Sequence, residues 1–324
     1  HLTNRGIVML RRISLSCLFL LTVIRLLSSV KGFAAPQSQT SVISDCSANG
    51  VTTAVAQGGA ITFDCDANPV TISLNEITIA ADQIVTIEGG NLITLSGGDT
   101  NRIFQIGPGG SLALNNITLS NGNSGSEAGG AILNEGMLTL DHTTVRDSKG
   151  SGGAAIHTQE GTVVVRNSQL LNNQATASGG ALSNQNGTVS IFNSRIEGNR
   201  AVNFAGVDSV GQLVMRASTV RGNLAEGGYG GGIGIQDGNA LIEDSLIEEN
   251  QAGSGGGGVY ISPNYQATVT IRRSRILHNQ ADITLDGTQG GGIYSGSVLT
   301  LDQVTVDDNR SYHSAGIYQY GSNG

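Results

Sequence analysis

The stretch "GGAILNEGMLTLDHTTVRDS", residues 129–148, joins a glycine pair to short segments in which apolar and polar residues alternate. Alternation with a period of two is typical of strands, and glycine pairs mark the corners between them. The pattern returns as "GGALSNQNGTVSIFNSRIEGN" at 179–199, "GGGIGIQDGNALIEDSLIEEN" at 230–250 and "GGGIYSGSVLTLDQVTVDDN" at 290–309. This repeat decides the fold.

The apolar residue that closes each glycine phrase gives the period of the repeat. These residues are Ile132, Ile156, Leu182, Val207, Ile233, Val259, Ile293 and Ile317. They lie 24 to 26 residues apart, except for one interval of 34 residues that begins at Val259. A period in the twenties indicates a solenoid, because one unit cannot bury its apolar face alone.

Each unit contains three short alternating strands, which excludes leucine-rich repeats, where a strand alternates with a helical segment. We therefore expect an all-β protein, a right-handed parallel β-helix of about ten turns stacked roughly 4.8 Å apart. The solenoid is expected over residues 60–324, with looser turns before residue 120. A short helix within 51–57 is expected to cap its open end, in a cap region over 35–59.

An asparagine column follows the third strand of successive units. Its members are Asn173, Asn199, Asn223, Asn250, Asn279 and Asn309, with Ser148 at the same place in the first unit. Asparagine tolerates left-handed backbone, and stacked amides hydrogen-bond from turn to turn. We interpret this column as a structural ladder at one corner, and the glycine pairs as the other corner, where positive φ or close approach excludes a Cβ.

The first residues have the features of a secretory signal. Arg11 and Arg12 precede an apolar run over 13–24, which is short for a membrane span, and Gly32 and Ala34 are the small residues that a signal peptidase site needs. We expect residues 1–34 to hold this signal and upstream residues, and the protein to be secreted or displayed on the cell surface. The alternative is an uncleaved anchor.

Cysteine usage fits export. Cys17 lies within the signal, which leaves Cys46 and Cys65. Exported proteins usually pair an even number of thiols, so we expect a disulfide between them, and two buried free thiols are the alternative. No Cys or His cluster has the spacing of a zinc site, so no metal and no cofactor is expected.

Composition narrows the class further. The chain has 324 residues with 48 Gly, 4 Pro and 13% charged residues, which fits many short strands joined by tight turns. The formal net charge of −8 is scattered along the chain, and this argues against binding of nucleic acid or of an anionic membrane. We expect a monomer whose only membrane contact would be an anchor after Gly324, where the pattern predicts a further strand.

The glycine and asparagine phrases resemble a known family. "GGAI" at 129–132, "GGAL" at 179–182, "IEGN" at 196–199 and "VRGN" at 220–223 are similar to the paired GGAI and FxxN motifs of polymorphic outer-membrane protein repeats. The chain departs from that pattern by using Ile, Val or Leu in place of Phe. The resemblance implies the pectin-lyase-like superfamily, the right-handed parallel β-helix fold, and a surface-displayed passenger with a role in adhesion.

Residues at equivalent positions of successive turns become neighbours and are the candidates for catalysis. His157, Ser183 and Asp208 occupy one column, but a working triad needs the histidine between the other two, and here Ser183 is in the middle. A corner column of Glu249, His278 and Asp308 is the remaining catalytic candidate, because carboxylates on nearby turns can serve as acid and base. The arginines that a lyase would use, Arg272, Arg273 and Arg275, are expected away from that corner.

Tyrosines form the candidate binding site. Tyr260, Tyr294 and Tyr318 share one outward column, and exposed rings suit sugar faces or a protein partner, although tyrosines that simply pack on each other are the alternative. We therefore expect an adhesin-like module that binds a glycan or a surface protein without catalysis. A polysaccharide lyase or glycoside hydrolase and a purely structural stalk are the alternatives.

Overall fold

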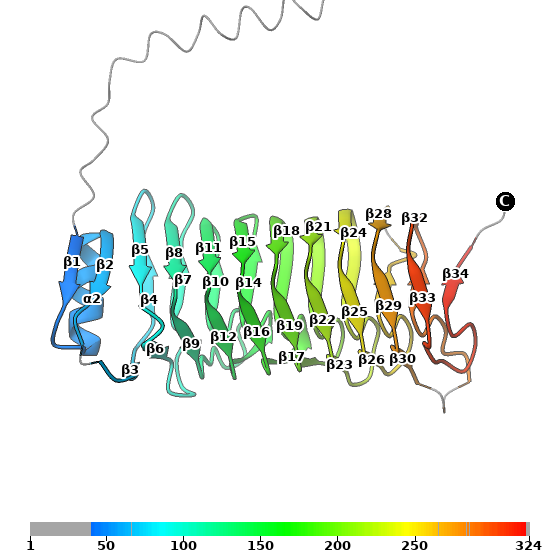
Figure 1. The fold of residues 1–324 in the computed structure, drawn as a ribbon, viewed down its shortest axis with the longest axis horizontal. Coiled ribbons are helices and arrows are strands. Elements are labelled where there is room, and N and C mark those ends of the chain that lie inside the picture. Colours follow the sequence, from blue (N-terminus) through cyan, green and yellow to red (C-terminus); the bar gives the residue numbers. More distant parts are fainter. Residues whose placement is uncertain (1–39, 66, 265, 283, 285, 322–324) are drawn as a thin grey trace, which may run out of the picture. The chain divides into compact units, whose positions relative to one another are not determined.

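A computed structural model describes residues 40–65, 67–264, 266–282, 284 and 286–321 (Figure 1). The predicted signal over 1–34 and the first part of the cap region lie outside the described residues. The described chain forms an all-β parallel solenoid, as expected, in which each turn stacks on the previous one. Figure 1 shows the turns in sequence order along the stack, from β1 to β34.

The largest sheet, sheet A, has 18 strands and consists of two ladders that merge in the middle of the stack. One ladder contains β4 (Ile77–Ile79), β7 (Phe104–Ile106), β10 (Ile132–Asn134), β14 (Ile156–Gln159), β27 (Val259–Ile261), β31 (Ile293–Ser295) and β34 (Ile317–Gln319). The other contains β1 (Thr40–Ile43), β2 (Gly59–Phe63), β5 (Ile84–Glu88), β8 (Ser111–Asn115), β11 (Met137–Asp141), β15 (Thr162–Arg166), β28 (Thr268–Arg272) and β32 (Val298–Asp302). Three long strands belong to both: β18 (Leu182–Phe192), β21 (Val207–Arg216) and β24 (Ile233–Glu243).

Sheet B has ten strands, one for each turn, and this confirms the expected size of the stack. Its strands are β3 (Val70–Ser73), β6 (Ile93–Ser96), β9 (Thr118–Ser120), β12 (Thr144–Arg146), β16 (Gln169–Leu171), β19 (Arg195–Glu197), β22 (Thr219–Arg221), β25 (Leu246–Glu248), β29 (Arg275–Leu277) and β33 (Thr305–Asp307).

A third sheet, sheet C, was not expected. Its six strands are β13 (Lys149–Gly152), β17 (Gln174–Ser178), β20 (Arg200–Ala201), β23 (Leu224–Ala225), β26 (Gln251–Ala252) and β30 (Gln280–Ala281). These strands follow the asparagine column directly, and several are only two residues long. So short a strand has no alternating pattern that a sequence could show.

The register of the strands confirms the repeat. The eight apolar residues from Ile132 to Ile317 pair in order from one turn to the next. Inward residues of the other two strands of a unit are fully buried in the middle turns, as Val163 and Val165 of β15 and Leu170 of β16 illustrate. Burial of one such side chain stabilises the fold by about 1.5–3 kcal/mol, so the stacked columns form one continuous core.

The asparagine ladder is present as expected. The Oδ1 atom of Asn223 accepts hydrogen bonds from the backbone N–H and the side-chain amide of Asn199, each at 2.9 Å. The Nδ2 atom of Asn223 donates to the carbonyl of Ile196 and to Oδ1 of Asn250. All six asparagines repeat this geometry where a next turn exists, and they are buried.

A serine ladder runs along a second corner, between sheets A and B. The backbone N–H of each member but the last donates a hydrogen bond to the hydroxyl of the member in the next turn. The members are Thr143, Ser168, Ser194, Ser218, Ser245 and Ser274. They are buried, and a hydroxyl suits this place because it both donates and accepts.

Glycine corners agree with the expectation. Gly129 has φ of 72°, which favours glycine. A Cβ on Gly130 would overlap the carbonyl oxygens of Lys149 and Ala154. The first glycine of the phrase is therefore required by backbone conformation and the second by the close approach of the next turn.

The helix α2 (Ala48–Gln57) covers the first turns, as Figure 1 shows at the blue end. It begins three residues earlier than the expected position because the hydroxyl of Ser47 caps it, accepting from the backbone N–H of Gly50. Val51 and Val55 are buried against the solenoid. The expected disulfide joins Cys46 to Cys65, with 6.0 Å between their Cα atoms, and links the start of the cap to the end of β2.

Candidate functional site

The tyrosine column lies on sheet A in register, with Tyr260 paired to Tyr294 and Tyr294 to Tyr318. The ring centroids of Tyr260 and Tyr294 are 4.9 Å apart and their planes are stacked, and those of Tyr294 and Tyr318 are 5.3 Å apart. The rings therefore cover one another's faces.

The column is not exposed along its whole length, contrary to expectation. Tyr260 is only 7% exposed, whereas Tyr294 and Tyr318 are half-buried. Burial raises the pKa of the Tyr260 and Tyr294 phenols, so both stay protonated and can donate hydrogen bonds. The role of the three tyrosines in binding stays a prediction. Tyr260 is the buried first member of the column, so only Tyr294 and Tyr318 are accessible to a ligand.

Two further aromatic residues enlarge the column into a cluster. Tyr229 packs against Tyr260 with 4.6 Å between ring centroids, and it is 41% exposed. Phe204 lies 5.8 Å from Tyr260 and its ring covers Gly234, where a Cβ would collide with it. Sequence reasoning missed both residues. Tyr229 precedes a glycine phrase and belongs to no outward column, whereas Phe204 takes the place of the first glycine of its phrase, with φ of 51°. That replacement and the bare Gly234 beside Tyr260 are the sequence signals for a ring placed there.

The His157, Ser183 and Asp208 column is in the expected order, with Ser183 paired to both neighbours. Ser183 and Asp208 are 2% and 1% exposed, so a substrate has no access to them. Burial raises the pKa of Asp208 to about 7, and its described partner is the Gln236 amide, which donates to Oδ1 at 2.6 Å. Burial also disfavours the charged form of His157 and so lowers its pKa. The Nδ1 atom of His157 has no hydrogen-bond partner among the described residues.

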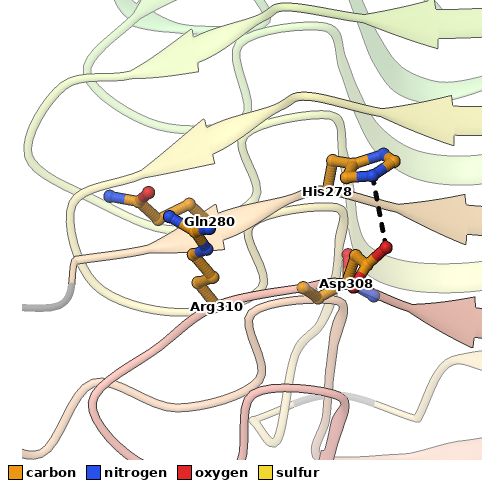
Figure 2. Close-up of a pocket in the computed structure, with 5 residues that line it drawn as sticks. His278, Gln280, Asp308 and Arg310 are labelled. Carbon is orange, nitrogen blue, oxygen red and sulfur yellow. Dashed lines mark ion pairs between the residues drawn. The ribbon is translucent and has the colours of Figure 1, made fainter.

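The catalytic candidates Glu249, His278 and Asp308 line an open groove at the corner between sheets B and C. All three have positive φ, which places them at the same point of the corner on neighbouring turns. Two hollows of about 530 and 490 Å³ meet there and share His278 and Gln280. Figure 2 shows the His278 ring turned toward Asp308, with 3.4 Å between Nε2 and the carboxylate oxygen.

The contacts of Glu249 do not favour acid–base chemistry. Its carboxylate accepts two hydrogen bonds from the Arg221 guanidinium, at 3.0 and 3.1 Å. A bidentate arginine stabilises the ionised form, so this carboxyl is a poor general acid. Glu249 and Asp308 are two turns apart, roughly 10 Å by strand spacing, with His278 between them.

The arginines near this region are engaged elsewhere. The carboxylate of Glu243, at the end of β24, is bound by Arg216 at 2.8 Å, by Arg272 at 2.7 Å and by Arg273. Arg273 also pairs with Asp244, and hydrogen bonds from these arginines lower the pKa of both carboxyl groups. Arg272 and Arg273 are therefore held at the corner with the serine ladder, away from the groove as expected. Their ion pairs hold neighbouring turns together.

Among the described residues, no group of three or more His, Cys, Asp or Glu side chains is placed to hold a metal ion. Over the same ranges, no helix is both long and apolar enough to cross a membrane.

Comparison with known proteins agrees with the fold. A family model described as a right-handed beta helix region matches residues 202–324. The matched part holds the aromatic cluster and most of the residues that line the groove. No curated protein matches the chain. The fold is thus a right-handed parallel β-helix, and these comparisons name no ligand and no reaction.

Proposed function

We propose that the protein is an exported, adhesin-like β-helix module that binds a surface glycan without catalysis. The observation that carries this proposal is the aromatic cluster of Phe204, Tyr229, Tyr260, Tyr294 and Tyr318. Its exposed members present apolar ring surface together with phenolic hydroxyls on one face of sheet A. This combination suits sugars, which have apolar faces and polar edges.

Export is proposed from two observations. The basic residues and the apolar run before residue 34 are typical of a signal peptide. The Cys46–Cys65 disulfide fits an oxidising compartment, where such bonds persist. A secreted or surface-displayed protein meets glycans in that compartment.

An enzyme of the polysaccharide lyase or hydrolase class is the second candidate, favoured by the Asp308 and His278 pair in an open groove. The first candidate is preferred because Glu249 is tied to Arg221, and because Arg272 and Arg273 are tied to Glu243. A catalytic pair needs groups that are free to move protons.

The test of the binding site is the double substitution Tyr294→Ser with Tyr318→Ser, measured on a glycan array. These residues are only half-buried, so the fold is expected to survive. Loss of ring surface is expected to weaken attachment by about tenfold or more, as for aromatic anchors of other binding sites.

Tyr312→Ser is the matched control, since Tyr312 is 50% exposed and has no ring contact with the column. It is expected to bind as the parent protein does. Equal attachment by the double variant and the parent would refute the tyrosine site.

A further inference from the structure

The groove at the corner between sheets B and C is a polar channel that follows the stack over several turns. One of its two hollows runs from Gly198 to Gln280 and the other from His278 to Arg310. The polar residues that line them include Arg200, Glu249, Gln251, Gln280, Asp308 and Arg310. We call this channel the corner groove; it shares no residue with the aromatic cluster.

Three side chains of the corner groove have unused hydrogen-bonding capacity. Within the described part of the chain, the amides of Gln251 and Gln280 and the guanidinium of Arg310 have no side-chain partner. Figure 2 shows the head groups of Gln280 and Arg310 at the side of the groove opposite the His278 and Asp308 pair. The other charged lining residues are paired: Arg200 with Glu226, Glu249 with Arg221, and His278 with Asp308.

These free groups are equally spaced. Gln251 pairs in register with Gln280, and Gln280 forms a parallel bridge with Arg310. Their backbone positions therefore repeat at the strand spacing of about 4.8 Å along the stack. A ligand that uses all three must present polar groups at regular intervals along an extended chain.

The chemistry of the lining selects the kind of chain. An amide both donates and accepts, and a guanidinium donates in a fork, so together they suit the hydroxyl pairs of a sugar ring. The formal charges of Arg200, Arg310, Glu249 and Asp308 sum to zero, and the outside partners Glu226 and Arg221 leave that sum unchanged, which disfavours a strongly charged polymer. Leu224 is the apolar side chain among the lining residues, which disfavours a lipid or an amphipathic peptide.

We infer that the corner groove binds a neutral polysaccharide chain that runs parallel to the solenoid axis, held by Gln251, Gln280 and Arg310. This site goes beyond the proposed tyrosine site: it lies on different strands and recognises an extended chain by hydrogen bonds rather than by ring surface.

The test is isothermal titration of neutral hexasaccharides of glucose, xylose and mannose into the parent protein and the variant Gln251→Ala with Gln280→Ala. At least one hexasaccharide is expected to bind the parent. The double variant is expected to bind it about tenfold more weakly, because two hydrogen bonds to neutral groups are lost. Arg310→Ala is expected to weaken binding in the same direction.

Gln174→Ala is the matched control, because Gln174 occupies the same column in an earlier turn outside the groove. It is expected to leave affinity unchanged. The Tyr294→Ser and Tyr318→Ser variant is expected to retain hexasaccharide binding. The corner groove and the tyrosine site are therefore tested independently of each other. The inference is overturned if no neutral hexasaccharide binds, if the double glutamine variant binds normally, or if Gln174→Ala is equally impaired.

Discussion

Asp208 shows how a residue that faces outward by strand alternation becomes buried. It pairs with Ser183 and Gly234 on the neighbouring turns, and Gln236 donates to its carboxyl group. The sequence places Asp208 correctly in its column, but alternation distinguishes only the two faces of a strand. It does not show which outward positions are covered by side chains of a neighbouring turn, as Asp208 is contacted by Gln236 of β24.

Stability is expected to fall as pH rises through the window from about 4 to 7 because of Asp208. The folded carboxyl keeps its proton up to about pH 7, whereas in the unfolded chain its pKa has the ordinary value of 3.8. The folded state therefore binds more protons within this window, and the free energy of unfolding decreases as pH increases. Above this window, a pKa shift of this size lowers the free energy of unfolding by about 4 kcal/mol in total.

Asp208→Asn is expected to remove this dependence and to raise the free energy of unfolding at pH 8 relative to the parent. Urea unfolding at pH 5 and pH 8 measures both effects, with Asp302→Asn as the control because Asp302 is exposed. An identical pH profile for the parent and Asp208→Asn would rule out the buried carboxyl as the cause.

Asn223 lies in the middle of the asparagine ladder, and its substitution tests whether the ladder stabilises the stack. Asn223→Leu leaves the backbone N–H and the amide of Asn199 without their shared acceptor. Unsatisfied buried groups are expected to lower the free energy of unfolding by about 1–3 kcal/mol. Gln212→Leu, on an exposed position of β21, is the control and is expected to be nearly neutral. An unchanged midpoint for Asn223→Leu would contradict a stabilising ladder.

At the scale of elements, the features with a repeating sequence signal were predicted and those without one were not. The strands of the repeat, the asparagine ladder, the capping helix and the disulfide are where the sequence places them. The serine ladder also has a signal, a serine one residue before each sheet B strand from β16 to β29, but serine is common in turns, so the signal does not by itself predict a ladder. Sheet C has strands too short for a pattern.

The candidate sites were only partly predictable for a related reason. The column of Tyr260, Tyr294 and Tyr318 follows from the repeat alone, because equivalent positions become neighbours. Tyr229 reaches the column from a loop before a glycine phrase, so its contact depends on loop conformation. Glu249 and Arg221 lie on adjacent turns, and their pairing depends on the rotamers of both side chains. The spacing of the repeat does not specify these rotamers.

At the scale of the whole molecule, the solenoid separates two surfaces with different chemistry. The aromatic cluster lies on sheet A, and the corner groove lies where sheet B meets sheet C. Both run along the stack because every turn repeats the same backbone path. A β-helix built in this way suits a module that holds an extended polymer on its surface, and binding without turnover is the central claim for this protein.

The most direct measurement is a depolymerisation assay on a glycan that the protein retains on the array. The protein is incubated with that glycan, and new reducing ends and unsaturated products are quantified for the parent and for Glu249→Gln with Asp308→Asn. We predict saturable binding by both proteins, with glycan recovered at full length. Chain cleavage by the parent that disappears in the double variant would contradict the binding module and establish the enzyme.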